Sequence, residues 1–126
     1  MAIKIEYLNK KFDKKTSNLV IFSNDRFIIK DYKKVIPESE FNYIRDLLKT
    51  NDLKKNILTF EINSKKKIIL ISIKNDLKNS DIENLGAEFH SRINNGKNKD
   101  YYIFSDSVVG KYENFLGHFL HGIKLK

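Results

Sequence analysis

The chain has 126 residues, of which 40% are hydrophobic and 32% charged, and its formal net charge is +8. This length suits a single domain with one core, and the hydrophobic content excludes a disordered composition. The lack of cysteine excludes disulfides and thiolate metal sites, and no apolar run of about 18 residues or apolar signal-peptide core is present. We therefore expect one domain, spanning residues 1–126, in the cytoplasm.

The basic side chains are almost all lysine, since only three of the 24 are arginine. A charge of this size predicts weak, nonspecific attraction to polyanions. Arginine-rich clusters with interleaved aromatic residues are missing, and abundant lysine, isoleucine and asparagine together are typical of an AT-rich genome. We favour solvated surface lysines over a dedicated nucleic-acid-binding surface, which stays open as an alternative.

The first part of the chain predicts strands. Ile3 to Tyr7 alternates with period two and indicates an edge strand, and the lysine-rich segment from Asn9 to Asn18 reads as a loop. Leu19 to Phe22 is continuously apolar, which is typical of a strand covered on both faces. A turn at 23–26 and a short strand at 27–29 follow.

Pro37 is expected to open a helix, because proline suits the first helical turn. Glu38 and Glu40 would lie in that turn, where the helix dipole favours negative charge. The apolar residues of the segment share one helical face. They are Phe41, Ile44, Leu47 and Leu48.

Two further strands, Ile57 to Ile62 and Ile68 to Ile71, are close enough to form a hairpin across residues 63–67. Leu58, Phe60 and Ile62 alternate along the first of them. The triplet Lys65 to Lys67 could bind phosphate, but three lysines alone define no geometry for a bound group. A solvated hairpin loop is the favoured interpretation.

Ser80-x-x-Glu83 has the spacing of a capping box, which predicts that a helix starts at Ser80. Asn95-Gly96 would end this helix, since both residues tolerate a left-handed backbone. Asp76, Asp81 and Glu83 are expected to serve as caps and to complement the helix dipole. The predicted buried stripe consists of Ile82, Leu85, Phe89 and Ile93.

Tyr101 to Phe104 predicts another strand, and Ser105, Asp106 or Ser107 could cap the helix after it. Gly122 is expected just past the end of that helix. The inner face of the helix would consist of Val108, Tyr112, Phe115 and Phe119. The order of elements predicts a three-layer α/β fold, a mixed sheet flanked by helices, centred on residues 19–22 and 68–71.

Motifs for chemistry are missing from the sequence. It contains no phosphate-binding glycine loop, no His-Glu-x-x-His, no Gly-x-Ser-x-Gly and no cysteine. His118 and His121 are three residues apart on a helix, as metal ligands can be, but no neighbouring carboxylate completes a site and Glu113 falls on another face. We interpret both, and His90, as ordinary surface or structural histidines, and assign no catalytic, cofactor-binding or metal-binding residue.

The closing segment carries a resemblance to a known family. Residues 114–121 run as an amphipathic helix into Gly122-Ile123-Lys124-Leu125. This pattern resembles the junction between the two domains of the leucyl (cytosol) aminopeptidases, which are two-metal peptidases. A central strand such as Ile68 to Ile73 and a helix with an arginine near its end, here Arg92, are also similar to that family. One departure is Ser72-Ile73-Lys74, where the family usually has a glycine-leucine-glycine turn.

The resemblance implies a macro-domain-like fold and the role of a non-catalytic N-terminal domain. Two divalent metals, manganese or zinc, and their ligands would belong to a C-terminal catalytic domain outside this chain, with no cofactor here. The implied partners are that domain and the other subunits of a homo-hexamer. A competing hypothesis is a stand-alone macro-type module for ADP-ribose, although its phosphate loops need clustered glycines and the five glycines here are scattered.

Overall fold

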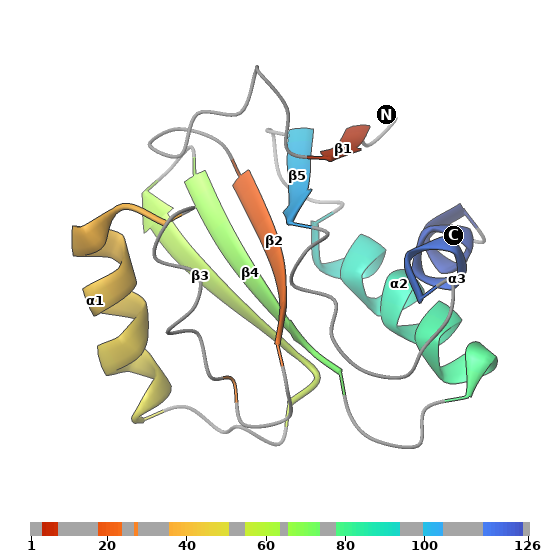
Figure 1. Cartoon of the computed structure of the whole chain (residues 1–126), viewed down its shortest axis with the longest axis horizontal. Coiled ribbons are helices and arrows are strands. Elements are labelled where there is room, and N and C mark those ends of the chain that lie inside the picture. The colour runs from red at the N-terminus through yellow and green to blue at the C-terminus, as the bar shows by residue number, and fades with distance from the viewer. Residues whose placement is uncertain are drawn as a thin grey trace.

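A mixed five-stranded sheet lies between helices on both of its faces in the computed structural model (Figure 1). The structure describes residues 4–7, 18–23, 27, 36–50, 55–63, 66–73, 78–93, 100–104 and 115–124. The three-layer α/β architecture predicted from the sequence is therefore confirmed.

The strands run in the order β1-β5-β2-β4-β3 across the sheet. Neighbours pair in parallel except β3 and β4, which form an antiparallel hairpin. Because β4 and β5 are parallel strands on either side of β2, the chain crosses over β2 between them. The strand bounds are β1 Lys4–Tyr7, β2 Asn18–Ser23, β3 Ile57–Asn63, β4 Lys66–Ser72 and β5 Asp100–Phe104.

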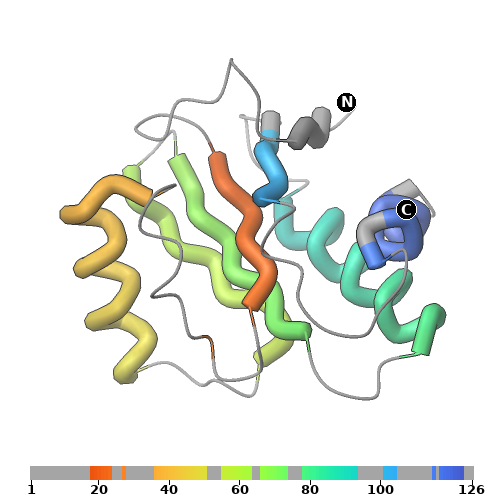
Figure 2. The backbone as a smooth tube through the Cα atoms, in the orientation of Figure 1, coloured from red at the N-terminus to blue at the C-terminus, as the bar shows by residue number. Residues whose placement is uncertain are grey.

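Among the described residues, three helices cover the sheet, with α1 on one face and α2 and α3 together on the other, as Figure 2 also shows. Their bounds are α1 Glu38–Leu48, α2 Asn79–Ile93 and α3 Phe115–Lys124. Pro37 precedes α1, as the sequence predicts. The buried stripe predicted for α2 is confirmed at all four of its positions.

The continuous apolar runs of β2 and β4 are explained by their central position. Every residue of β2 is buried, and β4 is buried except for the partly exposed Lys67. Alternate residues of both strands contribute to two separate cores. At the sheet edge, β3 instead alternates, with Leu58 and Phe60 buried on the α1 face and Thr59 exposed.

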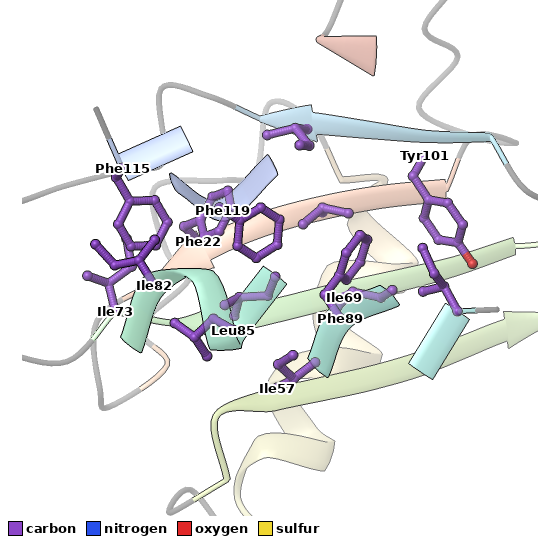
Figure 3. Close-up of a cluster of buried hydrophobic side chains, with 14 residues drawn as sticks. Phe22, Ile57, Ile69, Ile73, Ile82, Leu85, Phe89, Tyr101, Phe115 and Phe119 are labelled. Atoms are coloured by element: carbon purple, nitrogen blue, oxygen red, sulfur yellow. The ribbon is translucent and has the colours of Figure 1, made fainter. Parts of the chain in front are cut away.

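The core beneath α2 and α3 is rich in aromatic rings (Figure 3). Phe22 of β2 meets Phe115 and Phe119 of α3 edge to face, both with ring centroids 5.2 Å apart. Phe119 also contacts Phe89 of α2 at 5.5 Å. These four rings join the sheet, α2 and α3 in arrangements that aromatic pairs prefer.

The predicted hairpin is confirmed, but the interpretation of its lysines as a solvated loop is wrong for two of them. Lys66 and Lys67 belong to β4, so only residues 64–65 separate the strands. The Lys66 side chain is 2% exposed and its Nζ donates to Oε1 of Glu40 on α1. The backbone N–H of Lys67 donates to Oδ1 of the buried Asn18, at 2.8 Å. Asn18 thus opens β2 rather than ending a loop.

Phe27 differs from the predicted strand at 27–29. It lies outside any strand and has a φ of 54°, in the left-handed region that bulky residues rarely adopt. Its side chain is buried in the core beneath α1. Phe27 is therefore a buried apolar residue that does not belong to a strand.

Several predictions from the sequence fall outside the described residues. They concern the loop at 9–17, the turn at 24–26, Ile28 and Ile29, Lys65, Asp76, the helix end at Asn95-Gly96, the caps Ser105, Asp106 and Ser107, the stripe positions Val108 and Tyr112, and Leu125.

Replacing Phe119 by alanine should destabilise the protein by about 3 to 5 kcal/mol, because it opens a cavity among three aromatic rings. A matched control is Tyr43→Ala on α1, whose side chain is 48% exposed and should matter by less than about 0.5 kcal/mol. Urea midpoints of both variants measure the difference. Equal effects would contradict the packing described here.

Candidate functional site

Residues of α2 and α3 that are distant in the sequence converge where α3 crosses α2. Glu83 and Gly86 come from α2, and His118, His121 and Gly122 come from α3. The two groups are far apart in the chain. Only the packing of the two helices brings them together (Figure 2).

The start of α2 differs from the predicted capping box. The helix begins at Asn79, so Ser80 is its second residue. The carboxylate of Asp81 accepts from the backbone N–H of Lys78 at 2.8 Å, and the Lys78 carbonyl accepts the first helical hydrogen bonds. Asp81 is thus the residue that reaches back to the cap, as Glu83 was predicted to do. The Glu83 carboxylate bonds instead to α3.

Glycines allow the two helices to touch backbone to backbone. A Cβ atom built on Gly86 would lie 2.0 Å from the carbonyl oxygen of Phe119, and one on Gly122 would lie 1.9 Å from that of Glu83. No side chain fits at either position. Gly122 was predicted to follow the helix end, but it lies inside α3, which continues to Lys124. It is therefore a packing residue and not a cap.

This close approach places one carboxylate oxygen against two imidazoles. Oε2 of Glu83 is 3.0 Å from Nδ1 of His121 and 3.7 Å from Nδ1 of His118. The first distance is a hydrogen bond, and the second is an ion-pair distance when His118 is protonated. The sequence predicted that no neighbouring carboxylate completes a metal site with the histidines. Packing nevertheless brings the Glu83 carboxylate to them from a distant part of the chain.

The hydrogen bond from His121 is the main cause that lowers the pKa of Glu83 below its ordinary value, with the charges of His121 and His118 adding to it. Partial desolvation opposes this shift. The side chains remain partly open to water, with exposed fractions of 29% for Glu83, 27% for His118 and 57% for His121. The site is therefore a hydrated contact between helices.

This group can exchange protons and pair charges. An imidazole can exchange a proton near neutral pH, whereas a carboxylate does so only under acidic conditions. Across the described residues, no set of three or more His, Cys, Asp or Glu side chains is arranged to hold a metal ion. We therefore describe these three residues as an electrostatic contact and refer to them as the Glu83–His cluster.

A second polar feature lies at the carboxyl ends of β2 and β4. Ser23 and Ser72 are register partners there, and both are buried. The Oγ atom of Ser72 has no hydrogen-bond partner within the described part of the chain. Open α/β sheets bind ligands beside such strand ends, which makes this the position where a ligand would be expected.

No family model, curated protein or solved structure gives a significant match to this chain. The resemblance to the leucyl aminopeptidases therefore stays a prediction from the sequence pattern. Among the described helices, none is long and apolar enough to cross a membrane.

Gly86→Ala should destabilise the protein by about 1 to 3 kcal/mol or more, because the added methyl group collides with the backbone of α3. Gly117→Ala is the matched control, since Gly117 is exposed on α3 and alanine there should stabilise by about 0.5 to 1 kcal/mol. Thermal unfolding of both variants checks the opposite signs. A neutral Gly86→Ala would show that the helices are farther apart.

Glu83→Gln should reduce stability in a pH-dependent way. Because folding lowers the pKa of Glu83, its contribution is present above about pH 4.5, the ordinary value, and is lost as pH falls through the lowered pKa. The difference in unfolding free energy from wild type should therefore shrink as pH falls below about 4.5. Glu88→Gln is the control, since the Glu88 carboxylate pairs with Arg92 on the same helix, away from α3 among the described residues. Denaturant titrations at several pH values distinguish the two variants.

Proposed function

We propose that this chain is the non-catalytic N-terminal domain of a metal-dependent leucyl aminopeptidase that releases N-terminal amino acids in the cytoplasm. The segments that carry the resemblance support the proposal by their packing. They correspond to the buried central strand β4, to α2 with Arg92 in its last turn, and to α3. These elements share one core in the described structure.

The observation that carries the proposal is the way α3 is held. The side chains of Phe115 and Phe119 are buried against the sheet and α2. The backbone of α3 at Gly122 lies directly against the backbone of α2 at Glu83. A helix anchored on these contacts offers a stiff attachment for a following catalytic domain. In that role the chain would support hexamer assembly and shape access to active sites whose two manganese or zinc ions belong to the other domain.

The gene decides this proposal directly. The reading frame after codon 126 should continue into a long domain with a lysine, several aspartates and a glutamate as metal ligands. A stop codon there would contradict the proposal.

The purified chain alone should not hydrolyse leucine anilides, with or without added manganese or zinc, because the metal ligands would belong to the following domain. Release of the chromogenic aniline is the measurement. The longer gene product, tested under the same conditions, is the positive control. Hydrolysis that disappears on mutation of a residue of this chain would contradict the assignment.

The serines at the strand ends favour a second candidate, the stand-alone macro-type module for ADP-ribose. The Oγ of Ser72, buried and without a hydrogen-bond partner in the described part, could donate to a ligand beside the carboxyl ends of β2 and β4. Isothermal titration with ADP-ribose separates the candidates. The first expects no measurable heat, whereas a micromolar Kd lost in Ser72→Ala would favour the second.

A further inference from the structure

The Glu83–His cluster lies across the α2–α3 contact and depends on protons for its strength. A carboxylate only accepts hydrogen bonds, so an imidazole Nδ1 must carry a proton to bond to it. A neutral imidazole can hold its proton on either nitrogen, whereas a protonated one carries both and adds a positive charge. The bond of 3.0 Å between Glu83 and His121 is therefore strongest when the imidazole is protonated and the carboxylate is not.

We propose that Glu83, His118 and His121 form a proton-operated clasp, which tightens the docking of α3 on α2 when an imidazole is protonated and loosens it when both are neutral. The close approach at Gly86 and Gly122 fixes the helices at the distance that these side chains bridge. The same close approach prevents the two helices from sliding past each other, so the three side chains cannot move to other partners. The strength of the contact therefore depends on their protonation.

The neighbouring charged groups do not replace Glu83. On α2, Asp81 bonds to the Lys78 backbone and Glu88 pairs with Arg92. His90 is seven residues from Glu83, about 10 Å along the helix axis. On the sheet side, α3 rests on the phenyl ring of Phe22. Within the described residues, Glu83 is thus the carboxylate that faces the two imidazoles.

Because two imidazoles face one carboxylate, the number of bound protons that can strengthen the contact is limited. The first bound proton is balanced by the charge of Glu83, but a second would leave an excess positive charge in the cluster. His121 makes the shorter contact and His118 the longer one. One proton should therefore account for most of the tightening.

If the chain is the front domain of an aminopeptidase, the clasp would let pH set how firmly the helix leading to the catalytic domain is attached. This consequence rests on the proposed function, but the clasp itself does not. It can be tested on the isolated chain without any assay of activity, so failure of one proposal leaves the other standing.

The test is a double-mutant cycle between Glu83→Gln and His121→Asn, measured at pH 6 and pH 8.5. Asparagine places an amide near the position of Nδ1 but carries no titrating proton. Backbone hydrogen exchange of residues 119–123, corrected for intrinsic rates, reports opening of α3. The wild type should open about two- to fivefold less at pH 6 than at pH 8.5. Each variant should lose this dependence, and the double variant should match the single ones.

Two controls separate the clasp from a general charge effect on α2 and from a metal site. Glu88→Gln removes a carboxylate from the same helix and should leave the pH dependence of exchange intact. Zinc with and without a chelator tests whether the histidines hold a metal. Equal coupling between Glu83 and His121 at both pH values would overturn the proposal. So would stabilisation by zinc that is lost in His118→Asn or His121→Asn, because the cluster would then be a metal site.

Discussion

The close approach of α2 and α3 is the constraint on which the rest of this structure depends. At Gly86 and Gly122, each helix presents hydrogen atoms in place of a side chain, and the backbone of the other fills the space. This contact allows the rings of Phe115 and Phe119 to reach the sheet. It also brings Glu83 within bonding distance of His121. The apolar core and the polar contact on α3 are two results of one geometry.

On the opposite face of the sheet, the helix is held by different contacts. There α1 packs through apolar side chains, and Lys66 at the start of β4 reaches Glu40 in the first turn of the helix. A buried lysine needs such partners, because an unpaired charge in this environment is costly. Both faces thus combine apolar burial with a charged contact that fixes the position of a helix. The pair beneath α1 is enclosed, whereas the cluster on α3 stays open to water and to protons.

These differences bear on function. The Glu83–His cluster secures α3, the helix that the proposed front-domain role requires to be firmly attached. This agrees with the proposed role as a front domain, in which stability of α3 matters more than any single reactive group. The serines at the carboxyl ends of β2 and β4 lie where open α/β sheets commonly bind ligands.

The sequence by itself determined most of the local structure and the layer order. Continuous apolar runs identified β2 and β4 as central strands, and helical periodicity identified the buried faces of α1 and α2, because these patterns depend on neighbours along the chain. It did not determine the site. The spacing of Glu83 from Ser80 is that of a capping box, and Gly122 lies where a glycine would end a helix. Lys66 belongs to a lysine triplet that is typical of an exposed loop. Only tertiary packing decided that Glu83 pairs with His121, that Gly122 admits a second backbone and that Lys66 is buried, since each partner is distant in the chain.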